Sequence, residues 1–204
     1  GFIFRLKRDI FAIDSTTLKL SLDSIDWARH RRKKAAAKTH MSLNVGNRLP
    51  TFAVVEDAAH HDSTRADALC EGLKDGDVLL ADRAYMDLRF LHGLSGRGVF
   101  FVLREKENMV FEVTGRRPHK DPRILADETV RMSRKGSAEK YPQELRRITA
   151  VVEVDGKDVE MAFVTNNFAW SPRTVAELYR ARWAIETFFK ELKQTLQLAD
   201  FVGY

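Results

Sequence analysis

The repeat with which hydrophobic and polar residues follow one another differs from one segment of this chain to the next. Some segments are short apolar or alternating runs, which are typical of β-strands, and others repeat apolar residues at helical spacing. Three strands expected to form an antiparallel meander, followed by helix, strand, helix and strand, predict a mixed α/β sheet flanked by helices, with Asp14 on the first strand beside Asp82 on the fourth. In this first half, strands are expected at 9–22, 38–45, 51–55, 77–82 and 99–103, and helices at 64–73 and 86–94.

The segment between residues 105 and 168 is rich in strand patterns instead. Glycine, proline and the Asp155-Gly156 turn signal separate its expected strands at 109–113, 129–132, 147–154 and 159–164. The pattern becomes helical again after residue 168. We therefore expect residues 1–104 to form the first part of one core, 105–168 a β-rich insertion subdomain, and 169–204 the remainder of that core.

The stretch from Tyr179 to Lys193 places one carboxylate among cations and aromatic rings on a single expected helix. One stripe of this helix, about 80° wide, contains Tyr179, Arg182, Glu186, Lys190 and Lys193. The opposite face is apolar and contains Leu178, Ile185, Phe188, Phe189 and Leu192. The stripe suits a metal-binding carboxylate beside a phosphate backbone. An ordinary amphipathic helix with i, i+4 ion pairs, each worth about 0.3 to 0.5 kcal/mol, explains the same spacing.

Two aspartates upstream stand where short apolar runs end. Asp14 follows Ile10-Phe-Ala-Ile13, and Asp82 follows Val78-Leu-Leu-Ala81. Each is explained equally well as a turn residue or a helix cap. Taken with Glu186, however, they supply the three carboxylates that a two-metal phosphoryl-transfer site needs, because hard divalent ions prefer carboxylate oxygens.

These residues resemble a known family. The spacing Y-x2-R-x3-E-x6-K begins at Tyr179, and Asp82 begins the tetrapeptide D-R-A-Y, which is similar to a D-R-G-Y element. Both motifs are features of the DDE transposases of bacterial insertion sequences, and the resemblance spans essentially the whole chain. It implies an RNase H-like mixed sheet with a β-rich insertion between the second aspartate and the glutamate. Ala84 departs from the usual glycine, which bears on the local turn more than on the chemistry.

The resemblance also implies a function. Asp14, Asp82 and Glu186 would form the catalytic triad and hold two Mg²⁺ or Mn²⁺ ions, cleaving DNA at element ends and joining it to a target. Double-stranded DNA would be the partner, bound by a homodimer assembled on it. Tyr179, Arg182 and Lys193 would contact phosphates by this resemblance, and Lys190 and Trp183 are further DNA-binding candidates from their place on the helix. Trp183 could equally pack under the insertion.

Two other functions use the same features. A catalytically silent, DNA-binding remnant is disfavoured by the intact set of three acids, and a plain RNase H-like nuclease by the motif that begins at Tyr179. The N-terminal end-binding domain and the C-terminal dimerisation segment expected for the family are missing from this sequence. We therefore expect the sequence to be a catalytic-core fragment.

A dense basic segment follows the first expected strand. Between residues 29 and 34, His30 is accompanied by Arg29, Arg31, Arg32, Lys33 and Lys34. Such density of like charge favours a loop that grips DNA phosphates, and a merely solvated loop is the alternative. The net charge of +5 and the pI of about 9.4 are consistent with a polyanionic partner.

The single cysteine, the lengths of the apolar runs and the histidines indicate the cellular compartment and argue against a further metal site. Cys70 is the single cysteine and lies in an apolar helical context, so an intrachain disulfide is excluded and a core position is expected. No apolar run approaches the ~18 residues of a membrane span and no signal peptide opens the sequence, so we expect a cytoplasmic bacterial protein. His60, His61 and Asp62 suit a turn into a helix cap better than a metal site, because adjacent side chains point apart.

Overall fold

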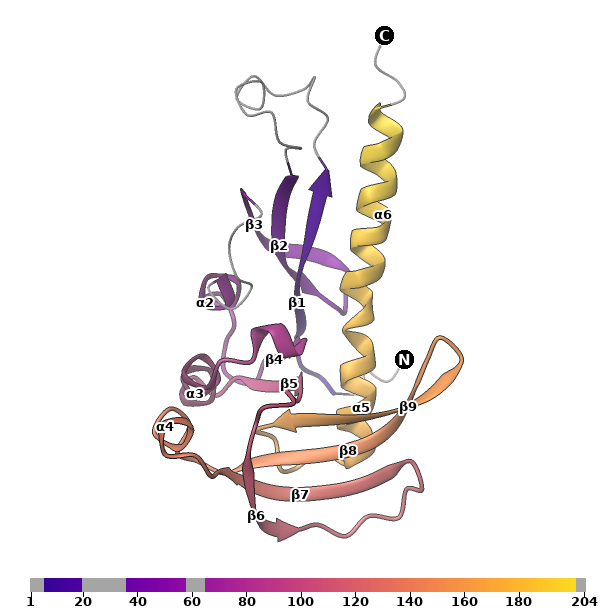
Figure 1. Ribbon diagram of the computed structural model, residues 1–204. Coiled ribbons are helices and arrows are strands. Elements are labelled where there is room, and N and C mark those ends of the chain that lie inside the picture. Colours follow the sequence, from indigo (N-terminus) through magenta and orange to yellow (C-terminus); the bar gives the residue numbers. More distant parts are fainter. Residues whose placement is uncertain (1–5, 20–35, 58–64, 201–204) are drawn as a thin grey trace.

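One mixed β-sheet organises the whole chain. The computed structural model describes residues 6–19, 36–57 and 65–200. Within these ranges the sheet has nine strands in the order β3-β2-β1-β4-β5-β9-β8-β7-β6 (Figure 1). A mixed sheet flanked by helices was the predicted class, and it is confirmed.

The first five strands form the half of the sheet that carries both aspartates. They are β1 (Ile10–Lys19), β2 (Ala36–Asn44), β3 (Leu49–Asp57), β4 (Val78–Ala81) and β5 (Phe100–Arg104). Strands β1 to β3 make the predicted antiparallel meander, whereas β4 pairs parallel with both β1 and β5. Strand β4 is buried along its entire length, as its continuous apolar run indicated.

The four later strands extend this sheet rather than forming a layer of their own. They are β6 (Phe111–Arg116), β7 (Ile124–Met132), β8 (Leu145–Val154) and β9 (Lys157–Thr165). They form an antiparallel meander, and β9 joins it to the core by pairing antiparallel with β5. Asp155 and Gly156 close the β8–β9 hairpin with φ angles of 50° and 75°, as the turn signal predicted. The segment expected as an insertion thus adds strands to one side of β5.

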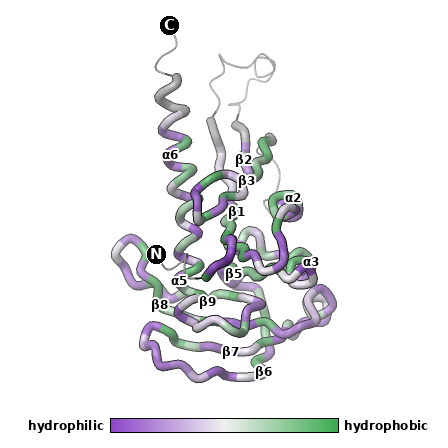
Figure 2. Tube along the Cα trace, turned by 180° about the vertical axis from the view of Figure 1, so that it is seen from behind, coloured by the Kyte–Doolittle hydropathy of each residue, from purple (hydrophilic) through white to green (hydrophobic). Residues whose placement is uncertain are grey.

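Helices cover the two faces of the sheet as separate groups (Figure 1). One face carries α2 (Ala66–Leu69), α3 (Leu88–Gly96) and α4 (Lys135–Ala138), and the other carries α5 (Pro172–Ala181) and α6 (Trp183–Asp200). Each face has its own buried cluster of apolar side chains. Hydrophilic stretches include the loops joining β6 to β7 and β8 to β9 (Figure 2). In the described part of the chain, no helix combines the length and apolar character needed to cross a membrane.

The helix boundaries differ from the sequence prediction in three places. The helix expected at 64–73 is regular only over α2 and continues as turns, although Cys70 and Leu73 are buried as predicted. Helix α3 begins at Leu88 rather than residue 86, because Asp87 caps it by accepting hydrogen bonds from two backbone N–H groups. The single helix expected from Tyr179 to Lys193 is wrong: α5 ends at Ala181 and α6 begins at Trp183.

Candidate active site

Asp14 and Asp82 lie side by side on the neighbouring parallel strands β1 and β4. In the register of β1 and β4, Ile13 is paired with Ala81, so Asp14 and Asp82 are each one position further along. The alternation of each strand then decides which face they occupy. Ala12 and Leu80, two positions earlier, belong to the core beneath α5 and α6, so both aspartates face that helix pair. The predicted adjacency of Asp14 and Asp82 is confirmed.

The helix pair above this face is interrupted at Arg182. Ser171 caps helix α5, because its hydroxyl accepts a hydrogen bond from the Thr174 backbone N–H at 3.1 Å, and Pro172 begins the first turn. At the break the backbone bonds tighten to three-residue spacing, from Arg182 N to Tyr179 O and from Ile185 N to Arg182 O, each 3.1 Å. Helix α5 packs across β4 and β5, and α6 packs against β1.

Arg182 joins the strand and helix carboxylates. Its Nη1 donates to Asp14 Oδ2 at 3.1 Å, and its Nη2 donates to Glu186 Oε1. Tyr179 completes the arrangement, because its hydroxyl donates to Asp82 Oδ1 at 3.2 Å and its ring lies 5.3 Å from the Arg182 guanidinium. Five side chains from β1, the end of β4, α5, the break and α6 therefore form one cluster, which includes all three predicted acids.

Tyr179 and Arg182 are buried rather than presented outward. Their exposed fractions are 3% and 6%, whereas Glu186 is exposed. The sequence interpretation of one outward charged stripe is therefore wrong at these two positions. Both side chains point at carboxylates, so their predicted contacts with DNA phosphates remain predictions that require them to exchange partners.

Burial controls the ionisation of this cluster. It raises the pKa of Asp14 to about 6, and the neighbouring carboxylates of Glu186 and Asp82 act in the same direction. The Ser15 backbone N–H, 2.8 Å from Asp14 Oδ1, and the Arg182 guanidinium oppose this rise in pKa. Burial also raises the pKa of Tyr179 to about 12, so its hydroxyl is a neutral donor at physiological pH. The site holds more negative charge than one arginine neutralises.

The donor set fits a hard divalent cation, with one condition. Among the described residues, no group of three or more His, Cys, Asp or Glu side chains is already arranged around a common metal position. Arg182 instead bonds to two of the three acids, as an internal cation would. The carboxylate oxygens and excess negative charge suit Mg²⁺ or Mn²⁺, provided that Arg182 releases Asp14 and Glu186.

The other predicted site residues lie elsewhere on α6 or outside the described ranges. Lys190 is exposed further along α6, and Trp183 and Lys193 are partly buried on the same helix. The basic segment Arg29, Arg31, Arg32, Lys33 and Lys34 lies outside the described residues, as do His60, His61 and Asp62.

One positioning residue was not identified from the sequence. Arg146 is 1% exposed, and two of its nitrogens donate to the Asp127 carboxylate at 2.8 and 2.7 Å. Its Nη1 donates to the backbone oxygens of Asn167 and Trp170 at 3.3 and 2.6 Å, so it holds the loop that leads into α5. The strand alternation of β8 could have revealed it, because Ile148 shares its parity and faces the same core.

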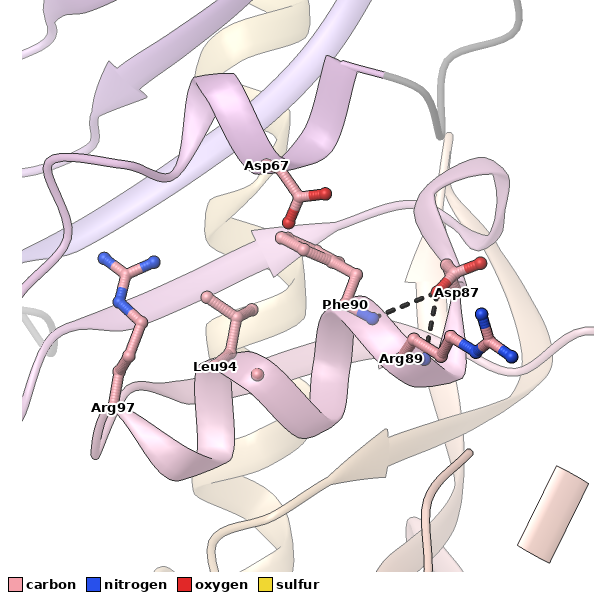
Figure 3. A pocket seen from close by; sticks show the side chains of 7 residues that line it. Asp67, Asp87, Arg89, Phe90, Leu94 and Arg97 are labelled. Atoms are coloured by element: carbon pink, nitrogen blue, oxygen red, sulfur yellow. Dashed lines mark hydrogen bonds between the residues drawn. The ribbon is translucent and has the colours of Figure 1, made fainter. Parts of the chain in front are cut away.

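A hollow in the described part of the protein lies away from this cluster. It has a volume of about 500 Å³ and lies on the opposite face of the sheet, between α2 and α3 (Figure 3). Asp87 in its wall accepts the capping bonds of α3, drawn as dashed lines in Figure 3, and Arg97 donates to backbone oxygens at the end of α2. Its charged groups thus stabilise helix ends.

Sequence comparison finds transposases among the proteins similar to this chain. A probable transposase for insertion sequence element IS5377 from Geobacillus stearothermophilus is 26% identical over 98% of this chain, and a protein named as transposase y4zB from Sinorhizobium fredii is 29% identical over 94%. The chain spans only 52% and 53% of their lengths, about half.

A solved structure shows the fold independently. The piggyBac transposase, in a synaptic complex with hairpin DNA, superposes with a TM-score of 0.53 at 9% identity, covering 89% of this chain and 40% of its own. At that identity the likeness shows the fold alone, an RNase H-like mixed sheet. The family model described as "Transposase DDE domain" matches residues 5–201. With nearly all of its length matched, the chain belongs to the transposase DDE domain family.

Proposed function

We propose that this chain is the catalytic part of a bacterial insertion-sequence transposase, which cleaves DNA at element ends and transfers the strands to a target. The observation that carries the proposal is the gathering of Asp14, Asp82 and Glu186 around Arg182 and Tyr179. Three acids drawn from two strands and a helix have no structural need to meet in a partly buried place, where their mutual repulsion is costly.

Asp14, Asp82 and Glu186 are the residues that would hold two divalent ions. When bound, such ions supply activation of the attacking oxygen and stabilisation of the leaving oxygen in an in-line displacement at phosphorus. Asp14 and Asp82 are held rigidly relative to each other, because they lie on neighbouring strands that pair in register. Tyr179 orients Asp82 through its hydroxyl, and its burial keeps that donor protonated.

Glu186 is the adjustable member of the set. It is exposed, follows the break at Arg182, and is bonded to a side chain that also bonds Asp14. We infer that Arg182 leaves the two carboxylates when the site is loaded, and then faces the phosphate of the bound strand. Lys190, Lys193 and Trp183 continue along α6 and extend the DNA-binding surface. The partners proposed are double-stranded element ends and target DNA, bound by a homodimer.

The test is cleavage of labelled duplex DNA by the full-length transposase in Mg²⁺ or Mn²⁺. Asp14→Asn, Asp82→Asn and Glu186→Gln each remove one ligand charge with little change in shape, so cleavage should fall below detection while DNA binding remains. Glu191→Gln is the matched control, because Glu191 is an exposed glutamate on the same helix without a contact to the cluster.

Thermal unfolding of each variant checks that lost cleavage does not reflect a lost fold. Persistent metal-dependent cleavage by Glu186→Gln would remove that residue from the site and overturn the proposed mechanism. DNA binding without cleavage by the unmodified protein would identify a silent remnant instead.

A further inference from the structure

Arg104 stands beside the acid cluster, at the end of β5. In the parallel register of β4 and β5, Ala81 is paired with Leu103. One step further along the two strands lie Asp82 and Arg104. An arginine thus occupies, on the third parallel strand, the place that Asp14 and Asp82 occupy on the other two.

The alternation of β5 places Arg104 on the same face as the acids. Phe100 and Val102 pack in the core beneath α5 and α6, whereas Phe101 and Leu103 pack on the opposite face. Arg104 shares the parity of Phe100 and Val102, so it faces the helix pair. In the antiparallel register with β9 it is paired with Phe163, whose ring lies 4.8 Å from the ring of Tyr179.

Arg104 is partly buried, yet its guanidinium makes no hydrogen bond or ion pair with any described residue. Neighbouring cations are engaged by protein groups. Arg83 pairs with Glu107 at 2.9 Å, Arg147 pairs with Glu105 at 2.7 Å, and Lys106 donates to Met86 O at 3.1 Å. Arg182 is held by Asp14 and Glu186.

This difference indicates a ligand that the protein itself does not supply. An arginine withdrawn partly from water and left without an anion is unfavourable, and Asp82, the acid at the equivalent position of the neighbouring strand, bonds Tyr179 instead. A guanidinium offers a planar pair of N–H donors that matches two oxygens of a phosphate group. Its position next to Asp82 would set such a phosphate directly beside the acids.

We propose that Arg104 is a phosphate-binding residue of the site. It holds the DNA strand on the β5 side of Asp82, whereas Asp14 and Glu186 lie on the β1 side. This inference rests on the proposed function and adds a contact that the motif beginning at Tyr179 does not include. Because the contact is with the backbone, it is independent of base sequence and sensitive to salt.

The experiment removes one negative charge from the DNA and one positive charge from the protein, separately and together. Binding of the protein to a set of duplexes, each with one phosphate replaced by a neutral methylphosphonate, is measured by fluorescence anisotropy. The same set is then measured with Arg104→Met, Arg104→Lys and, as a matched control, Arg83→Met. Arg83 follows Asp82 directly but is 44% exposed and paired with Glu107.

With the unmodified protein, one or two methylphosphonate positions should weaken binding by about tenfold, the size of a charge-assisted contact. With Arg104→Met those positions should have no further effect, and the slope of log affinity against log salt should fall by about 0.9. Arg104→Lys should recover part of the loss, and Arg83→Met should behave as the unmodified protein.

Two outcomes would overturn the inference. If every methylphosphonate weakens Arg104→Met and the unmodified protein equally, or if the unmodified protein does not bind DNA at all, Arg104 holds no phosphate. Cleavage of the same duplexes distinguishes failure of this inference from failure of the proposed function. If Arg104→Met abolishes the effect of the sensitive methylphosphonates but the protein never cleaves DNA, only the function is refuted. If the protein cleaves DNA and Arg104→Met responds to every methylphosphonate as the unmodified protein does, only the inference is refuted.

Discussion

Replacing Arg182 by methionine should make the protein less stable without metal and should make it bind metal more tightly. The side chain remains unbranched and apolar along its stem but loses the charge that bonds Asp14 and Glu186. In the metal-free protein the two carboxylates then repel each other without compensation. In the metal-bound protein the ions neutralise them, so the loss of Arg182 should matter less.

The burial of each partner sets the magnitude. The side chains of Arg182 and Asp14 are 8% and 22% exposed, and removing one member of a buried pair costs about 3 to 5 kcal/mol. The Glu186 side chain is 48% exposed, so its pair with Arg182 contributes on the surface scale of about 0 to 1 kcal/mol. Since Asp14 is not completely buried, we expect a loss of about 2 to 3 kcal/mol in the free energy of unfolding without metal.

Linkage converts this loss into affinity. Stability that is lost in the metal-free state and retained in the bound state appears as tighter binding, and every 1.4 kcal/mol corresponds to about a factor of ten. Allowing for a remaining contribution of Arg182 in the bound state, the dissociation constant for Mn²⁺ should fall by about 10- to 100-fold.

Urea unfolding and titration calorimetry with Mn²⁺ measure the two quantities independently of catalysis. Both measurements are made at pH 8, above the pKa of about 6 that burial gives Asp14, so that Asp14 of the unmodified protein is ionised before metal is added. Arg180→Met is the matched control, because Arg180 is exposed on α5 and should change neither quantity. Unchanged or weaker Mn²⁺ binding by Arg182→Met would refute the view that Arg182 competes with metal for these acids.

Three further outcomes are expected. Arg146→Ala should lower the free energy of unfolding by about 3 to 5 kcal/mol, measured in urea, because it strands a buried carboxylate, whereas Arg123→Ala at an exposed pair should cost less than about 1 kcal/mol. Tyr179→Phe keeps the packed ring but removes the bond to Asp82, so thermal unfolding should report a loss of about 0.5 to 1.5 kcal/mol. Alanine at the five basic positions of 29–34 should reduce the salt dependence of DNA binding by about 0.9 per lost phosphate contact, and an unchanged slope would mean a solvated loop.

The sequence was sufficient where one local signal decides the structure. A four-residue apolar run has only one good solution in a sheet covered on both faces, a buried central strand, and β4 is that strand. Asp82 was identified from this run, and Asp14 from the apolar run at the start of β1. Glu186 was identified from its sequence spacing to Tyr179, Arg182 and Lys193, and this spacing does not depend on whether the helix is continuous at Arg182.

The sequence was insufficient where distant segments decide the structure. The break between α5 and α6 needs neither proline nor glycine, because a residue in helical conformation can shift to three-residue hydrogen bonding. The pairing of β9 with β5 joins segments whose order periodicity does not specify. The burial of Arg182 depends on Asp14, which no pattern within the helix can indicate.

The contact between Arg182 and Asp14 joins residues 168 positions apart, and that between Tyr179 and Asp82 joins residues 97 apart. The site therefore cannot close during synthesis before α5 and α6 have emerged, and both follow the nine described strands along the chain. A nascent chain interrupted after the β8–β9 hairpin carries Asp14 and Asp82 but neither Arg182 nor Glu186. Under the proposed function, a chain interrupted at that point lacks a complete site with which to cut the chromosome that encodes it.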